Sequence, residues 1–106
     1  MSTGKTLRVP YGAWVTDPSG DGAPTFYLAE QLNVQEVELL AVEPPEVGRA
    51  VQLRLLVENE REVVDVQGQV VRHGGRGAAA HFAVRFTRLD GNRRRFLADL
   101  VAEAQP

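Results

Sequence analysis

The residues of this chain that could carry out chemistry are few and lie apart in the sequence. The two histidines, His73 and His81, have no carboxylate beside them at the spacing of a metal site or an acid–base pair. The only serines, Ser2 and Ser19, lie in the N-terminal stretch and in a turn, not in a nucleophile elbow. The chain has no cysteine, which excludes disulfides and thiol nucleophiles. The sequence therefore predicts a protein that is not an enzyme and holds no metal or other cofactor.

Two further patterns contain residue types that functional sites use, but the neighbouring sequence that such sites need is missing. Glu36 and Glu38 lie on one face of an expected strand, but the sequence around them does not indicate a pocket. The glycine-rich stretch 74–77 lacks the lysine and the following helix of a phosphate-binding loop. We therefore expect this stretch to form a hairpin turn.

Charge is unevenly distributed along the chain, although the net charge is only −2. Residues 30–65 contain nine acidic side chains and three arginines, and residues 72–95 contain seven arginines and one aspartate. One interpretation is that the two segments form solvated faces that lie opposite each other in the fold. The other is that they form two binding surfaces of opposite sign. The candidate partner-binding residues are then Glu36 and Glu38 in the acidic segment and Arg93, Arg94 and Arg95 in the basic one.

Length and composition predict one small domain. The chain has 106 residues, of which 43% are hydrophobic and 25% charged, as in ordinary globular domains. We expect a single domain over residues 1–106, with a barrel over about 8–88 and a helix over about 90–104. The sequence contains no apolar run of the ~20 residues that a membrane span needs and no secretory signal. It therefore predicts a cytoplasmic protein without a membrane span.

The hydrophobic pattern predicts strands, because apolar and polar residues alternate with the period of two that places one strand face in the core. Strands are expected at residues 12–17, 25–33, 37–42, 50–57, 62–72 and 80–87. In the last of these, Phe82, Val84 and Phe86 should point inward and Ala83 outward. A glycine inside a strand often marks a bulge or a close backbone approach, and Gly68 is such a residue.

The end of the chain has the pattern of an amphipathic helix. Asp90 is a suitable N-cap. An apolar stripe recurs at helical spacing in Phe96, Leu97, Leu100, Val101 and Ala104. Three arginines at the start oppose the helix dipole, which is either tolerated or a sign that they make a contact. Six strands and one helix predict a mainly β fold, a six-stranded antiparallel barrel with the C-terminal helix over one mouth.

The aromatic side chains have two interpretations. Most of them, including Phe26, fall at inward positions or strand starts and are expected in the core. Tyr11 and Trp14 lie three residues apart near the first strand, and exposed aromatics of this kind are favoured as interface anchors.

The order of these segments resembles the PilZ domain family. The likeness is most specific in the C-terminal half, where residues 66–72 (VQGQVVR) and residues 81–86 (HFAVRF) are similar to the last two strands of that family. Residues 44–48 (PPEVG) are similar to its Pro-x-x-x-Gly turn. The resemblance spans about residues 8–101 and implies the barrel and the closing helix.

PilZ domains typically bind cyclic di-GMP through an RxxxR segment and a [DN]xSxxG motif, and this chain departs from both. Arg8 matches the second arginine of the first motif, but Gly4 stands where the first arginine belongs. Asn33 matches the start of the second motif, while Gln35 replaces its serine and Glu38 its glycine. The resemblance therefore implies a fold that keeps Arg8 and Asn33 as residual nucleotide-motif positions. The missing arginine and the carboxylates of Glu36 and Glu38 predict that cyclic di-GMP does not bind tightly.

The resemblance implies a function in bacterial motility or polarity signalling. We expect a non-enzymatic adaptor that acts through contact with a protein partner whose identity the sequence does not give. One alternative is a receptor for cyclic di-GMP or another nucleotide with an altered, weak site built from Arg8, Asn33, Arg72 and His73. A nucleic-acid-binding barrel is disfavoured, because the phenylalanines of the arginine-rich region alternate away from the arginines.

Overall fold

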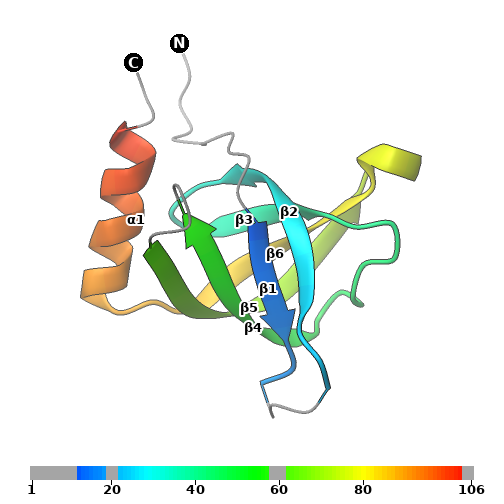
Figure 1. The fold of residues 1–106 in the computed structure, drawn as a ribbon, viewed down its shortest axis with the longest axis horizontal. Coiled ribbons are helices and arrows are strands. Elements are labelled where there is room, and N and C mark those ends of the chain that lie inside the picture. The colour runs from blue at the N-terminus through cyan, green and yellow to red at the C-terminus, as the bar shows by residue number, and fades with distance from the viewer. Residues whose placement is uncertain (1–11, 19–21, 58–61, 104–106) are drawn as a thin grey trace.

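The computed structural model describes residues 12–18, 22–57 and 62–103. Its elements are β1 (Gly12–Thr16), β2 (Thr25–Leu32), β3 (Glu36–Leu40), β4 (Ala50–Val57), β5 (Glu62–Gly74), the short 3-10 helix η1 (Gly77–Ala79), β6 (His81–Arg88) and α1 (Gly91–Glu103). The strands form a closed antiparallel barrel in the order β1-β2-β3-β6-β5-β4, with α1 beside it (Figure 1). This confirms the predicted architecture. The largest differences in strand bounds are in β5, which runs two residues past the expected end, and in β3, which starts one residue before and ends two residues before its expected bounds.

Alternation along the strands fills the barrel, as the sequence predicts. The inward side chains of β4 pair in register with those of β5, so that Leu53 lies opposite Val66 and Leu55 opposite Val64. Phe82 of β6 is fully buried and meets Tyr27 of β2 edge to face, with ring centroids 5.0 Å apart. Aromatic pairs of this geometry stabilise a core beyond the area that they bury.

The burial of two side chains on β6 differs from what the alternation predicts. Phe86 is only partly buried and packs against the edge of the core, beside a register shift between β5 and β6. Ala83 points outward as expected from the alternation but is fully buried. Its burial has a specific cause, described below, in the charged side chains of the neighbouring strands.

The prediction that Phe26 belongs to the core is wrong. Phe26 lies directly opposite Trp14 across β1 and β2, their ring centroids are 5.2 Å apart, and each side chain is 40% exposed. The ring of Phe26 rests over Gly12, where an added Cβ would lie 2.2 Å from it. Tyr11 lies outside the described residues. Of the two candidate interface aromatics, Tyr11 and Trp14, the structure therefore describes only Trp14, which is exposed.

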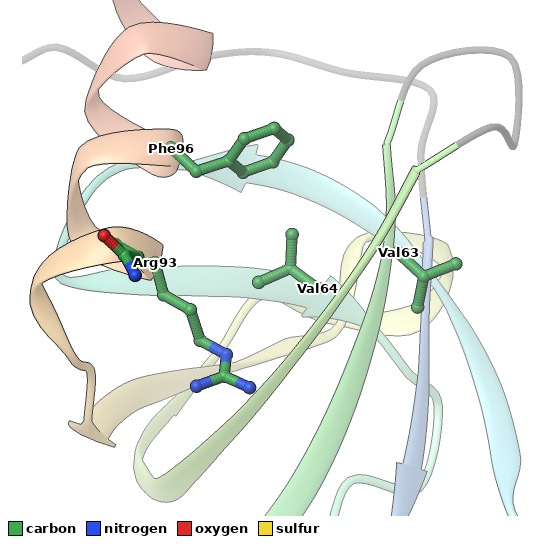
Figure 2. A pocket seen from close by; sticks show the side chains of 5 residues that line it. Val63, Val64, Arg93 and Phe96 are labelled. Carbon is green, nitrogen blue, oxygen red and sulfur yellow. The ribbon is translucent and has the colours of Figure 1, made fainter.

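The helix begins as predicted and packs against one mouth of the barrel. A carboxylate oxygen of Asp90 accepts a hydrogen bond from the backbone N–H of Arg93 at 2.8 Å, and this bond lowers the pKa of Asp90 below its ordinary value. Leu97 is fully buried, and Phe96 points towards Val64 of β5 (Figure 2). None of the helices in the described residues is long and apolar enough to cross a membrane.

Candidate functional site: the charged face of β3, β5 and β6

Asn33 shapes the turn that leads into this face. Its side-chain oxygen accepts hydrogen bonds from the backbone N–H groups of Gln35 at 2.7 Å and Glu36 at 2.9 Å. The backbone N–H of Asn33 donates to the carbonyl oxygen of Glu36 at 3.0 Å, which closes the turn. Asparagine favours such turns because its amide oxygen can satisfy backbone donors two or three residues further on. The retained motif residue therefore has a structural role in this chain.

Asn33→Ala is expected to lower the free energy of unfolding by about 1–2 kcal/mol, because two backbone donors lose their acceptor. Chemical denaturation followed by Trp14 fluorescence measures this change. Asn92→Ala is the matched control, since Asn92 lies in the first turn of α1, where alanine is the better helix former. Equal stability of the two variants would show that the Asn33 side chain does not hold the turn.

Strand register brings the acidic and basic segments of the sequence together. Glu36 of β3 lies opposite Arg85 of β6. Glu38 of β3 lies opposite Ala83, and Ala83 in turn lies opposite Arg72 of β5. Arg72 and Glu38 therefore flank the small side chain of Ala83, and their contact across β6 explains why Ala83 is buried on the outer face.

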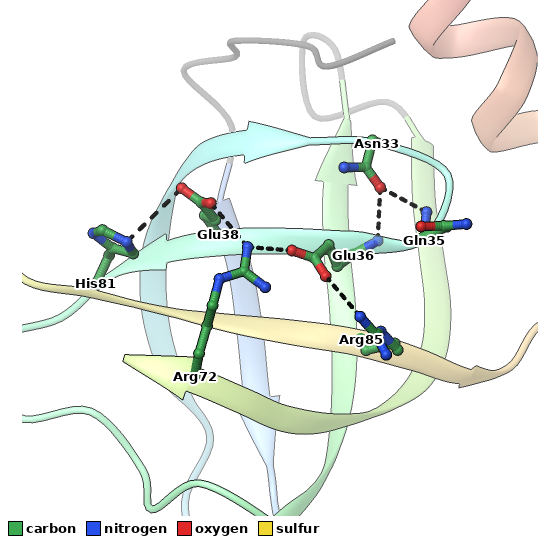
Figure 3. A network of polar contacts seen from close by, with 7 residues as sticks. All are labelled: Asn33, Gln35, Glu36, Glu38, Arg72, His81 and Arg85. Carbon is green, nitrogen blue, oxygen red and sulfur yellow. Dashed lines mark hydrogen bonds and ion pairs between the residues drawn. The ribbon is translucent and has the colours of Figure 1, made fainter. Parts of the chain in front are cut away.

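The charged side chains on this face form one network (Figure 3). A guanidinium nitrogen of Arg72 donates to a carboxylate oxygen of Glu36 and to one of Glu38, the latter at 3.3 Å. Arg85 lies 3.7 Å from the second oxygen of Glu36, and His81 lies 4.0 Å from Glu38. The bond to Glu36 is the largest cause of the raised pKa of Arg72. We call these five residues the charged face.

The carboxylates of the charged face are more enclosed than its arginines. The side chains of Glu36 and Glu38 are 12% and 22% exposed, whereas those of Arg72 and Arg85 are 48% and 60% exposed. Two carboxylates and two guanidiniums balance each other when His81 is neutral. On this face the acidic and basic segments thus lie side by side and neutralise each other.

Neither histidine is placed as a metal ligand. A ring nitrogen of His73 lies 2.6 Å from the carbonyl oxygen of Pro45, and one of His81 lies 3.1 Å from that of Ala79. Within the described residues, no group of three or more histidine, aspartate or glutamate side chains could hold a metal ion.

The other predicted site residues lie apart from the charged face or outside the described residues. Arg8 is not among the described residues. Arg93 forms an ion pair with Asp90 at 2.6 Å. Arg94 and Arg95 are exposed, and no ion pair joins them to another described residue. The sequence prediction missed Arg85 and Ala83 as parts of the charged face, because their roles depend on strand register.

Two solved structures share the fold of this chain. MotI/DgrA, an inhibitor of motility from Bacillus subtilis, matches 99% of this chain at a TM-score of 0.78 and 7% identity. This chain covers only 51% of that protein. The PilZ domain of YcgR from Escherichia coli, solved with c-di-GMP, matches 98% of this chain and is covered to 91%, at a TM-score of 0.77 and 13% identity.

These two structures share the fold of this chain at very low sequence identity. A search of curated proteins finds no match. The sequence model of the PilZ domain family matches residues 6–103, which is nearly the whole chain. The chain therefore belongs to the PilZ domain family, as the sequence resemblance indicated.

Proposed function

We propose that this chain is a regulatory PilZ domain that acts as an adaptor through contact with a protein partner and does not bind cyclic di-GMP tightly. The observation that carries the proposal is the charged face, where Arg72 and Arg85 are already paired with Glu36 and Glu38. Glu38 stands at the position of the glycine in the nucleotide-binding motif of the family. The side chains that could hold phosphates on this face therefore have internal partners.

Electrostatics oppose a dianionic ligand on this face. Relative to the same arginines without their carboxylates, a phosphate about 5 Å from one carboxylate loses about 3 kcal/mol of binding free energy at an effective dielectric constant of 20, which corresponds to more than a hundredfold in affinity. The ligand could avoid this repulsion only by displacing the carboxylates from their arginines. Such a displacement leaves a carboxylate that is 12% exposed without its partner, which is also costly.

The closed barrel limits how a protein partner can bind. Each described strand is paired with a neighbour on both sides, so the described part of the barrel offers no free edge for the addition of a partner strand. Within this part of the chain, contact therefore runs through side chains on the outer surface or on α1. The exposed pair of Trp14 and Phe26 is consistent with such a contact, because exposed aromatics are enriched at interfaces.

A role in motility or polarity signalling in a bacterium is supported by the relatives. The structure of MotI is described as that of an inhibitor of motility, and the chain shares its fold. PilZ domains are regulatory or receptor domains and not enzymes, which agrees with the lack of a catalytic constellation in the sequence.

Calorimetric titration of the chain with cyclic di-GMP tests this proposal. We expect no binding tighter than about 100 μM, since the repulsion estimated above removes at least two orders of magnitude. The PilZ domain of YcgR is the positive control, because its structure was solved with the nucleotide. Micromolar or tighter binding by this chain would overturn the proposal.

The second candidate function is a nucleotide receptor with an altered site. It would draw on Arg8, Asn33, Arg72 and His73, of which the last three have the internal hydrogen-bond contacts described above. If any nucleotide does bind, Arg8→Ala should abolish the binding under this candidate. Unchanged binding by Arg8→Ala would count against it.

A further inference from the structure

A second polar site lies beside the charged face, where three elements meet. The turn between β2 and β3, the end of β6 and the first turns of α1 enclose a cleft of about 340 Å³. Its polar lining is made of Gln35, Arg85, Thr87 and Arg94. Val34, Phe86 and Leu89 supply its apolar lining. We call this site the arginine cleft.

Positive charge in the arginine cleft is not balanced. Arg94 has no ion-pair partner among the described residues. Among the described residues, the only ion pair of Arg85 is with Glu36, at a distance of 3.7 Å that is too long for a hydrogen bond, and Glu36 is also bound by Arg72. Two guanidiniums from different elements, an amide and a hydroxyl group therefore offer hydrogen-bond donors to an anion. Guanidiniums bind carboxylates and phosphates well because their planar N–H groups match the spacing of the oxygens.

Two local features of the sequence favour this arrangement over a chance one. The register of β5 and β6 shifts so that Thr87 is the extra residue between Phe86 and Arg88, and bulges of this kind re-aim side chains at functional sites. Arg94 lies in the first turns of α1, where a cation opposes the helix dipole. Arg94 therefore does not stabilise the helix, and a role in binding at the cleft accounts for its position.

The surroundings of the arginine cleft favour a carboxylate over a nucleotide. Each phosphodiester of cyclic di-GMP carries one negative charge, as a carboxylate does, so the size of the cleft decides between the two ligands. A volume of about 340 Å³ is near the lower limit for small-molecule sites and suits one or two side chains. The exposed aromatic pair, Trp14 and Phe26, lies on β1 and β2, so it offers no stacking platform here.

We propose that the arginine cleft binds a glutamate or aspartate side chain in an acidic segment of the partner protein, with Arg85 and Arg94 as its ligands. The aliphatic lining by Val34 and Leu89 accommodates an apolar side chain next to the acid. This inference rests on the proposed function, because it assigns the surface through which the adaptor holds its partner.

Amide chemical shifts of the isotope-labelled chain during a peptide titration test the proposal. The probe is the acetylated, amidated peptide ELEELE, and its uncharged counterpart is QLQQLQ. We expect saturable shifts at Gln35, Thr87 and Arg94 with the acidic peptide, with a dissociation constant on the order of 0.1–1 mM, and none with the counterpart. Failure of the acidic peptide to shift these amides would overturn the proposal.

Arg94→Gln and Arg95→Gln form a matched pair of variants. Both remove one arginine from the first turns of α1, so they change net charge and helix stability alike, but only Arg94 lines the cleft. We expect Arg94→Gln to weaken peptide binding at least about fivefold and Arg95→Gln less than about twofold. Equal losses in the two variants would mean that the peptide responds to overall charge, and the cleft assignment would be wrong.

Inorganic phosphate and cyclic di-GMP, added separately at the same ionic strength, complete the test. Weaker binding of both than of the acidic peptide supports a carboxylate site. Tighter binding of phosphate at the same amides would overturn the choice of a protein carboxylate. Because the proposed function is tested by calorimetry with cyclic di-GMP, a missing peptide response would refute the cleft and leave that function standing.

Discussion

Gly68→Ala is expected to lower the free energy of unfolding by about 3 kcal/mol, although it adds only one methyl group. The added Cβ would lie 2.4 Å from a methyl carbon of Val84 and 2.9 Å from the carbonyl oxygen of Arg85. Val84 is fully buried and cannot move aside without disturbing the core, and the carbonyl belongs to the backbone of β6. The substitution therefore forces β5 and β6 apart where their register shifts.

Chemical denaturation of the variant and of Gly91→Ala measures this effect with its control. Gly91 is the first residue of α1, and an added Cβ there meets no atom within 4 Å. Alanine at this position should stabilise the protein by up to about 1 kcal/mol, since glycine is a poor helix former. Glycine-to-alanine substitution should thus lower the free energy of unfolding at position 68 and raise it at position 91. A Gly68→Ala protein as stable as the parent would show that the two strands are not as close as described.

Restoring the nucleotide-binding motif of the family is expected to raise the affinity for cyclic di-GMP by about a hundredfold or more. The triple variant is Gly4→Arg, Gln35→Ser and Glu38→Gly. The first change supplies the missing arginine of the RxxxR segment. The last removes a carboxylate that lies 3.3 Å from Arg72, and so leaves this arginine with one partner fewer.

The double variant Gly4→Arg, Gln35→Ser differs from the triple variant only in keeping Glu38, so a comparison of the two isolates the effect of the Glu38 carboxylate on binding. It keeps Glu38, so we expect it to bind at least about tenfold more weakly than the triple variant in the same calorimetric titration. Thermal unfolding must show that both variants are folded, because glycine inside a strand costs about 0.5–1 kcal/mol. Equal affinities of the folded double and triple variants would mean that the Glu38 carboxylate does not block the ligand.

Much of the barrel could be predicted from the sequence because the period of two determines which side chains fill the core. Leu53 and Val66 each lie between two polar residues in the sequence, and each is buried. Phe26, expected in the core because it stands at a strand start, is exposed; it pairs with Trp14 across the two strands and rests over Gly12. These are contacts between strands, which alternation along one strand does not encode.

The charged face depends on strand register, and for this reason its network could not be predicted from the sequence. Val70 pairs with Val84, but Arg72 pairs with Ala83, so Val71 is an extra residue in β5. This bulge brings Arg72 opposite Ala83 and hence next to Glu38. The two candidate carboxylates were visible in the sequence, but their arginine partners lie more than thirty residues further along the chain.

The central claim is that Glu36 and Glu38 hold the guanidinium of Arg72 by hydrogen bonds, so that this arginine is not available to the nucleotide of the family. The most direct measurement follows the side-chain Nε–H signals of Arg72 and Arg85 by NMR while cyclic di-GMP is added to the unaltered chain. We predict that both signals stay in place up to millimolar nucleotide. A saturable shift of these signals at micromolar nucleotide would contradict this account.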